Sequence, residues 1–312
     1  MSANVPCFPD FVPLSIAIKD VLHPRLSLTL DGVSEFTFTG LYLFRNRYNY
    51  QISRIGEEGG FIVSGTQPVG EKQGKKFFMT PCSAPDDDTL QSLFETHDYW
   101  KNISESVLSP VKEKLEGRGI VITEDRDNFD YLYYRSELAE LSGKKFHKKK
   151  NHLNKFLSSY PNHEQRPINK ESIPAAMKVL DRWRNESLQK NEGSEGDYIA
   201  SKEALELFDV LPLQGSVFFV DGKPAAFCLG ESIAGGKMFV IHFEKAIDEY
   251  KGIYQYVNQS FAESLPDSFN LINREQDLGN EGLRQAKETY RPCDFVRKYT
   301  GVRTDTVRIG KG

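Results

Sequence analysis

The sequence predicts a mixed α+β protein made of two similar halves. The chain has 312 residues, roughly twice the length of about 150 residues that is typical of one domain. Over residues 163–299 the hydrophobic pattern predicts the element order β-α-α-β-β-β-α-β-α-β. Residues 11–123 show three strands followed by alternating helix and strand, which is a looser form of the same order. We therefore expect an α/β fold with two tandem domains.

Apolar spacing, turn residues and prolines define the elements of the second half. Asp221-Gly222 stands between two apolar runs and indicates a two-residue β-hairpin. Pro266 and Pro292 each end a predicted helix, because proline cannot continue the hydrogen-bond ladder. The expected strands are 163–168, 216–220, 225–230, 237–243, 269–272 and 295–299, and the expected helices are 172–189, 199–211, 252–265 and 280–290.

The first half is predicted in the same way, with a bridge to the second. A strand is expected over the alternating residues 131–134, and a basic helix over 136–157 then joins the halves. We place the boundary near residue 158, which gives an N-terminal domain 1–158 and a C-terminal domain 159–312. The other expected elements are helices 11–21, 88–97 and 110–115 and strands 50–55, 61–64, 75–80 and 119–123.

The predicted order of elements is that of the GNAT acyltransferase fold, a mixed sheet with helices on both faces. The sequence therefore predicts two tandem GNAT-like (acyl-CoA N-acyltransferase) domains, of which the first is degenerate. A fold of this kind hosts many activities, so the function has to be argued from particular residues.

Composition and charge exclude several classes of protein. The net charge of −4 gives no global attraction to nucleic acid or membrane. The four cysteines form no CxxC pair and are expected to be reduced thiols. No apolar run reaches the roughly 18 residues that a membrane span needs, and the first residues have no basic n-region. We expect a cytoplasmic protein, at the membrane surface if its acceptor is a lipid.

One basic segment stands out from this acidic background. Residues 144–155 hold six lysines, two histidines and no acid. On a continuous helix, Phe146, Lys150 and Leu153 would share one face, which would place Lys150 in the apolar stripe. The segment is either a solvated face or a phosphate site for RNA or a lipid headgroup. His147 and His152 are five residues apart, which is not the spacing of paired metal ligands, so we expect no metal.

The strand-to-helix region 240–259 corresponds to the coenzyme A loop of GNAT enzymes. There, backbone N–H groups at a helix N-terminus bind the pyrophosphate in a Q/R-x-x-G-x-G/A motif. Gly252 takes the first glycine position, but Tyr254 and Glu249 replace the second small residue and the Q/R residue. We therefore expect no cofactor, with acyl-CoA as the alternative. Glu244 ends the preceding strand, and Asn258 shares a helix face with Tyr254.

Polar residues follow the buried strand 269–272 at once. In α/β sheets, sites are built at the carboxyl ends of strands, so Arg274, Glu275 and Asp277 are candidates for substrate binding. The alternative is a structural salt-bridge cluster. On the next helix Lys287 and Tyr290 share a face, and partial burial would lower the pKa of Lys287 and suit it to anion binding or proton transfer.

Four segments together resemble a known family. They are DYLYYRSELAELSGKKFHKKKNHLNKF, HFEKA, KGIYQYVNQSFA and NREQDLGNEGLRQAKETYRP. They are similar to bacterial proteins related to the C-terminal domain of phosphatidylglycerol lysyltransferase. The resemblance implies tandem GNAT-like domains and kinship with Fem-type ligases, which move an amino acid from aminoacyl-tRNA to an amine or hydroxyl. Lys287 and Tyr290 match the family's lysine and the aromatic residue three positions later.

These observations predict an acyl- or aminoacyltransferase that uses aminoacyl-tRNA and an amine, hydroxyl or phospholipid headgroup as acceptor. The alternatives are an acyl-CoA-dependent N-acyltransferase and a non-catalytic protein that binds an anion or nucleic acid. The predicted catalytic residues are Lys287, Glu244 and Tyr290; the substrate-binding residues are Arg274, Glu275, Asp277, Tyr254, Asn258 and Arg284; the polyanion-binding residues are Lys145, Lys148, Lys149 and Lys150.

Overall fold

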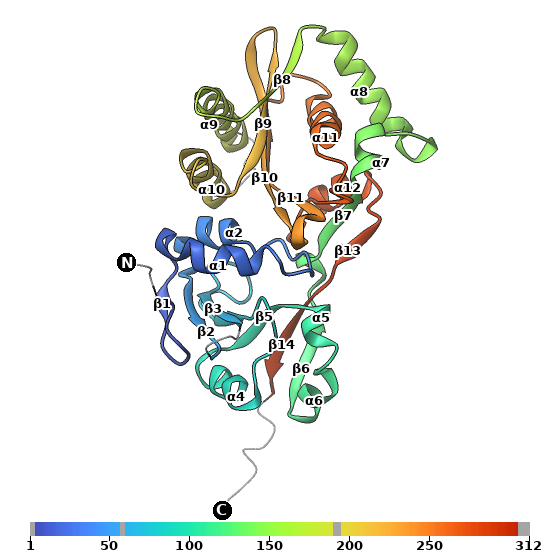
Figure 1. Cartoon of the computed structure of the whole chain (residues 1–312). Helices are drawn as coiled ribbons and strands as arrows, with labels where there is room; N and C mark the ends of the chain where they lie inside the picture. The colour runs from blue at the N-terminus through green and yellow to red at the C-terminus, as the bar shows by residue number, and fades with distance from the viewer. Residues whose placement is uncertain (1–3, 57–59, 190–194, 305–312) are drawn as a thin grey trace, which may run out of the picture. The chain divides into compact units, whose positions relative to one another are not determined.

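The computed structural model describes residues 4–56, 60–189 and 195–304 and consists of two compact units (Figure 1). The first unit is formed by Met1–Phe129 with Val296–Gly312, and the second by Asp130–Phe295. Within the described residues, each unit is built on one seven-stranded mixed sheet. The expectation of two mixed α+β units is therefore confirmed.

The sheet of the first unit runs in the order β1-β2-β3-β4-β5-β14-β6. All of its described pairings are antiparallel except β4 with β5, which are parallel. The strands are β1 (Val12–Pro13), β2 (Gln51–Arg54), β3 (Phe61–Thr66), β4 (Lys76–Met79), β5 (Tyr99–Ser104), β6 (Ile120–Glu124) and β14 (Lys298–Arg303).

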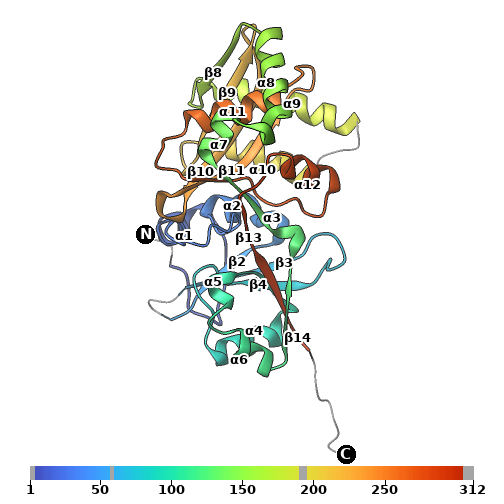
Figure 2. The ribbon, with the colours of Figure 1, turned by 90° about the vertical axis from the view of Figure 1, so that its right-hand side faces the viewer.

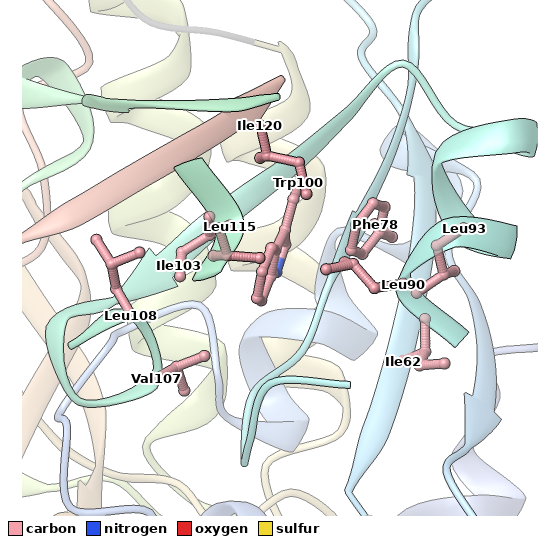
Figure 3. Packing of buried hydrophobic residues seen from close by; sticks show 10 residues of the cluster. All are labelled: Ile62, Phe78, Leu90, Leu93, Trp100, Ile103, Val107, Leu108, Leu115 and Ile120. Atoms are coloured by element: carbon pink, nitrogen blue, oxygen red, sulfur yellow. The ribbon is translucent and has the colours of Figure 1, made fainter. Parts of the chain in front are cut away.

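Three helices of the first unit, α2, α4 and α5, begin at residues whose side chains cap them, and α4 packs on an aromatic core. Asp86 caps α4 by accepting a hydrogen bond from the Thr89 N–H at 2.9 Å. In Figure 3 the rings of Phe78 and Trp100 stack, with centroids 5.6 Å apart, and Leu93 of α4 lies in the same cluster. The helices are α1 (Lys19–Leu26), α2 (Phe38–Leu43), α3 (Arg45–Tyr48), α4 (Asp87–Thr96), α5 (Glu105–Leu108) and α6 (Lys112–Gly117).

Several parts of the first unit differ from the prediction, and helices α2, α3 and α5 were not predicted at all. The helix expected over 11–21 is instead the short strand β1, a 3₁₀ turn and then α1, which begins only at Lys19. The sequence pattern also missed β5, because the polar residues Lys101 and Asn102 interrupt its apolar run. Asn102 is nevertheless buried, since β5 lies inside the sheet between β4 and β14.

The sheet of the second unit runs in the order β13-β7-β12-β11-β10-β9-β8. Strands β8 to β11 pair antiparallel, whereas β11 and β12 pair parallel. The strands are β7 (Asp130–Tyr134), β8 (His163–Pro167), β9 (Gln214–Val220), β10 (Lys223–Ile233), β11 (Met238–Ala246), β12 (Leu271–Asn273) and β13 (Asp294–Val296).

Helices cover both faces of this second sheet. In Figure 1, α9 and α10 lie on one face of the sheet, and α8 and α11 lie on the other. The helices are α7 (Arg135–Glu140), α8 (His147–Ser159), α9 (Ile173–Gln189), α10 (Glu195–Glu206), α11 (Ile253–Ser264) and α12 (Glu281–Glu288). Helices α9 to α12 and strands β8 to β12 follow the order predicted for residues 163–299.

Each predicted half of the chain supplies one strand to the sheet of the other half, and these two strands set the boundaries of the compact units. Strand β7 precedes the rest of the second unit in sequence but pairs antiparallel with β12. Strand β14, near the C-terminus, pairs with β5 and β6 of the first unit, where Figure 2 shows it in red among blue and green elements. The compact units therefore change over at residues 129/130 and 295/296 and not at the predicted residue 158. Pairing over such long separations leaves no local sequence signal.

The predicted continuous basic helix is wrong. Helix α7 ends at Leu141, which adopts a left-handed φ of 48°, and Gly143 (φ 81°) precedes a 3₁₀ turn that leads into α8. The buried residues of α8 are Leu153 and Phe156, so the apolar face of this helix includes Lys149, which is half-buried, while Lys150 is exposed. The expectation that Lys150 lies in the apolar stripe is therefore also wrong.

Candidate active site

The candidate site lies where the two parallel strands of the second sheet part. Strands β11 and β12 are paired over three residues only, ending at Val240 opposite Asn273. Beyond that point β11 continues to Ala246, whereas the chain after β12 parts from β11 and stays hydrogen-bonded to Tyr131 of β7, to which the Arg274 N–H donates at 3.0 Å. His242 has no partner on β10, where the register passes from Phe243 to Ile241, so a β-bulge interrupts the alternation of faces between His242 and Glu244. Each of the two contacts a residue that follows β12: His242 contacts Glu275, and Glu244 contacts Arg274.

Glu244 gathers two of the predicted substrate-binding residues. The Arg274 guanidinium approaches both Glu244 carboxylate oxygens, at 3.5 and 3.4 Å. The Asn258 amide on α11 donates to Glu244 Oε1 at 2.8 Å and to the Tyr254 carbonyl oxygen at 2.9 Å. Although burial opposes it, Glu244 raises the pKa of Arg274. The structure thus brings together Glu244, Arg274 and Asn258, three of the candidate residues.

Tyr290 lies at the centre of a second group of contacts. The Lys149 amine lies 4.0 Å from the centroid of the Tyr290 ring, and the Arg274 guanidinium carbon lies 5.1 Å from the same centroid. Burial and the charge of Arg274 lower the pKa of Lys149 to about 8. Burial raises the pKa of Tyr290 to about 12, against the effect of Arg274. Two cations therefore share one buried aromatic ring.

Lys287 is buried and holds the loop after β12. Its amine donates to the backbone carbonyl oxygens of Arg274, Glu275 (3.0 Å) and Gln276 (2.8 Å). An ammonium has three protons, so these contacts use all of them. Burial, followed by the charge of Arg274, lowers the pKa of Lys287 to about 8. Lys287 thus lies at the predicted site, with its amine directed to the backbone that carries Arg274 and Glu275.

A buried imidazole joins two carboxylates beside this loop. His242 Nδ1 lies 2.7 Å from Glu275 Oε1, and Nε2 lies 2.9 Å from Glu231 Oε1. Burial alone would lower the pKa of His242, but the hydrogen bonds with Glu231 and Glu275 raise it to about 10. Glu275 itself has a left-handed φ of 56°. This conformation is uncommon for a residue with a side chain and is often found at functional sites.

Sequence reasoning missed Glu231 and His242. A signal for them was present: Glu231 and His242 are polar positions inside strands that are otherwise almost entirely buried and apolar. A buried polar residue in such a strand needs a partner. Only the pairing of β10 with β11, which aligns Glu231 with Val240, shows that the two lie on the same face.

Asp277 and Arg284 form a separate network with Tyr131. Arg284 donates to the Asp277 carboxylate at 2.8 and 2.9 Å, and the Tyr131 hydroxyl donates to it at 2.6 Å. Although burial opposes it, Arg284 and Tyr131 hold the pKa of Asp277 well below its usual range. This network ties the loop after β12 to α12 and β7, which is the structural role that we left open for Asp277.

The region of the coenzyme A loop has other contacts. Gly252 has a φ of 91°, and a Cβ built there would lie 2.8 Å from the His152 carbonyl oxygen, so glycine is needed where α11 approaches α8. Glu249 forms an ion pair with Arg182 at 2.5 Å. Burial, followed by the charge of Glu244, raises the pKa of Tyr254.

The four candidate polyanion-binding lysines do not form one patch. Lys149 faces the site, whereas Lys145, Lys148 and Lys150 are exposed. The Lys145 amine pairs with Glu137 at 2.5 Å, and the Lys150 amine donates to the Glu140 carbonyl oxygen at 3.1 Å. Within the described part of the chain, no group of His, Cys, Asp and Glu residues could hold a metal ion, and no helix is long and apolar enough to span a bilayer.

Comparison with known proteins supports the fold and shows the family. A conserved protein of unknown function from Bacteroides thetaiotaomicron VPI-5482 is 30% identical and superposes with a TM-score of 0.83 over 94% of this chain and 99% of that one. A C-terminal domain from Agrobacterium fabrum, named as that of a lysylphosphatidylglycerol synthetase, is 17% identical, with a TM-score of 0.60 over 93% of each chain. FemX is 9% identical, with a TM-score of 0.53 over 95% of this chain and 97% of its own.

These matches confirm the tandem GNAT-like fold and the predicted resemblance. The family model described as the C-terminal part of phosphatidylglycerol lysyltransferase matches residues 27–301, which is most of the chain. The matched region includes every residue of the candidate site. The chain belongs to the phosphatidylglycerol lysyltransferase C-terminal family.

Proposed function

We propose that this protein transfers an aminoacyl group from aminoacyl-tRNA to an amine or hydroxyl acceptor. The observation that carries the proposal is the buried group of Glu244, Arg274, Tyr290 and Lys149 at the opening between β11 and β12. It combines one carboxylate that can accept a proton with two cations that can stabilise an oxyanion. Membership of the lysyltransferase family supports transfer of an amino acid.

The reaction needs a nucleophile, an activated ester and a route for one proton. The acceptor oxygen or nitrogen forms a bond to the ester carbonyl carbon, and the bond from that carbon to the ribose oxygen breaks. The acceptor's proton passes to Glu244 and then to the departing ribose oxygen. The positive charge of Arg274, beside Glu244, stabilises the negative charge that develops on the carbonyl oxygen in the tetrahedral intermediate.

Lys287 acts in this proposal as a positioning residue. Its amine is already bonded to three carbonyl oxygens of the loop 274–276. By holding that loop it fixes Arg274 on one side and Glu275 on the other. Groups that are already fixed need not reorganise during the reaction, and this accounts for much of the rate enhancement of a preorganised site.

The exposed lysines beside the site would bind the RNA. Lys145, Lys148 and Lys150 belong to the segment that carries Lys149, so a polyanion held by them would pass close to the candidate site. Phosphate contacts of this kind supply affinity that does not depend on sequence. The acceptor is then an amine or hydroxyl compound, and a phospholipid headgroup is the one that the family suggests.

Acyl-CoA fits this loop poorly as the donor. In the position of the pyrophosphate loop, Gly252 is packed against the α8 backbone, and Glu249, which pairs with Arg182, puts a carboxylate at the position of the motif's Q/R residue. Like charges oppose such binding. The contacts of the loop therefore favour an aminoacyl-tRNA donor.

The test is a transfer assay with radiolabelled lysyl-tRNA and two acceptors, phosphatidylglycerol vesicles and a mixture of soluble primary amines. We expect a labelled product that is alkali-labile if the acceptor is a hydroxyl and alkali-stable if it is an amine. Glu244→Gln should slow transfer by roughly a hundredfold, whereas Arg166→Gln, on the exposed strand β8, should not slow it. The proposal is rejected if neither acceptor is labelled with lysyl-tRNA or with a full set of aminoacyl-tRNAs.

A further inference from the structure

Two polar atoms next to Glu244 are buried and lack partners. They are Arg274 Nη1 and Asn258 Oδ1, which have no hydrogen-bond partner among the residues that the structure describes. The Tyr290 hydroxyl is a third such atom, and the Gln255 side chain lies near it without forming a hydrogen bond of normal geometry. Buried polar groups are nearly always paired. The unpaired polar atoms of Arg274, Asn258 and Tyr290 therefore indicate a ligand.

The orientation of these atoms is fixed by the contacts that their residues do make. The Asn258 amide nitrogen donates to both Glu244 and the Tyr254 carbonyl, which leaves its oxygen as a free acceptor. Arg274 Nη2 donates to Glu244 at distances near the outer limit of a hydrogen bond, and Arg274 Nη1 has no partner among the described residues. The site thus offers donors from Arg274 and Tyr290 and one acceptor from Asn258.

The charges around Tyr290 favour an anion. Lys149 and Arg274 both lie on this ring, and Glu244 is the carboxylate that faces Arg274. Lys149 forms no ion pair within the described ranges, and burial and the repulsion of Arg274 lower its pKa to about 8. The carboxylates of Glu231 and Glu275 are both bound to His242. An anion placed between Lys149 and Arg274 would relieve this repulsion.

We propose that Arg274, Lys149 and Tyr290 form a cradle for one phosphate group, that of the terminal nucleotide of an RNA. The three donors come from separate parts of the chain: the residue after β12, helix α8 and the second residue after α12. Donors that approach from several sides suit a tetrahedral phosphate better than a planar carboxylate. Asn258 Oδ1 would accept a hydrogen bond from a hydroxyl of the same nucleotide.

A nucleotide is favoured over a lipid phosphate because of the helix that supplies Lys149. Lys148 is exposed next to Lys149 on α8, and Lys145 is exposed just before this helix. A polyanion with its end in the cradle could continue along these lysines. The inference deepens the proposed function, since it assigns this phosphate to the RNA donor, and it makes no statement about the acceptor.

The test measures the binding of small phosphates to the full-length protein by calorimetry. The probes are inorganic phosphate, adenosine 5′-monophosphate and glycerol 1-phosphate. We expect saturable binding of all three, with the adenosine monophosphate bound about tenfold more tightly than glycerol 1-phosphate, because the ribose ring holds its hydroxyls in place for Asn258 whereas the flexible glycerol loses conformational freedom when it makes the same contact. Tighter binding of glycerol 1-phosphate would overturn the assignment to RNA.

Variants locate the binding and separate it from the transfer reaction. Arg274→Gln and Lys149→Gln should each weaken phosphate binding at least about tenfold, and Lys155→Gln, an exposed lysine on the same helix, should not. Tyr290→Phe keeps the ring and removes only the hydroxyl, so it gives a milder test if Arg274→Gln does not fold. At pH 8 binding should take up a fraction of a proton, and Lys149→Gln should abolish this uptake.

Two results would overturn the cradle: no saturable phosphate binding by the unmodified protein, or equal binding by all of these variants. Either result together with normal transfer from lysyl-tRNA would leave the proposed function standing. Phosphate binding in the cradle without transfer to any acceptor would support the cradle and reject the proposed function.

Discussion

The amine of Lys287 donates a hydrogen bond to the backbone carbonyl oxygen of Arg274, the residue whose guanidinium faces Glu244. This contact joins α12 to the end of β12 across 13 residues of sequence. Two further carbonyl oxygens of the same loop share the amine. The position of the Arg274 side chain therefore depends on a lysine that need not touch the substrate.

Replacing Lys287 with Met should affect both stability and transfer. The methionine fills similar space but leaves three carbonyl oxygens without a donor, which should lower the free energy of unfolding by roughly 1–3 kcal/mol. Transfer should fall by at least about tenfold through kcat, with little change in the KM for tRNA, because the loop loses its fixed position. Urea unfolding and steady-state kinetics measure the two effects. Unchanged kcat in a folded variant would contradict the positioning role.

The imidazole of His242 should make stability depend on pH. Its pKa is raised from 6.5 to about 10 in the folded protein, so the folded state holds one more proton than the unfolded state between these values. The stabilisation is complete below pH 6.5 and is lost as the pH rises through 10, at up to about 1.4 kcal/mol per pH unit. Urea unfolding at pH 6.5, 8 and 9.5 measures this slope. In His242→Gln the slope should be much smaller, and an equal slope in the variant would assign it to other groups.

The sequence predicted local order well and long-range pairing poorly. The strands and helices of residues 163–299 follow from apolar spacing and prolines. The candidates Glu244 and Arg274 follow from polar residues at strand ends, and Lys287 follows from the helix face that it shares with Tyr290. The exchange of β7 and β14 between the sheets depends on hydrogen bonds between strands more than 130 residues apart in sequence. The periodicity of apolar residues does not indicate which sheet a strand joins.

The same limit explains the lysine that was misplaced. Counting at 100° per residue along one continuous helix put Phe146, Lys150 and Leu153 on one face. However, α7 ends before Leu141 and Gly143, Phe146 lies in the 3₁₀ turn that follows, and the buried residues of α8 are Leu153 and Phe156. Gly143 is a recognisable breaker, whereas a leucine with positive φ carries no signal. Lys149 faces Tyr290 and its neighbours Lys148 and Lys150 do not, although the residue type is the same at all three positions.

Gly252→Ala should destabilise the second unit more than a comparable change in a turn. The new Cβ would lie 2.8 Å from the His152 carbonyl oxygen, and the φ of 91° is strained for alanine. We expect a loss of about 2 kcal/mol or more, seen as a lower Tm. Gly222→Ala is the matched control, because its φ is also positive (74°) but nothing lies within 4 Å of the new Cβ. Equal losses in the two variants would mean that the approach of α8 to α11 adds nothing.

The exposed lysines should control the salt dependence of tRNA binding. Lys145, Lys148 and Lys150 point to solvent beside the site, so their charges would act on the RNA backbone without being needed for the fold. Replacing all three with Gln should reduce the slope of log K against log salt by about 0.9 for each duplex phosphate contact that is lost. Filter binding at several KCl concentrations measures the slope, and the thermal stability should stay close to that of the unmodified protein, since exposed lysines contribute little to it. A slope that does not change would show that these lysines form a solvated surface only and that any RNA binds elsewhere on the chain.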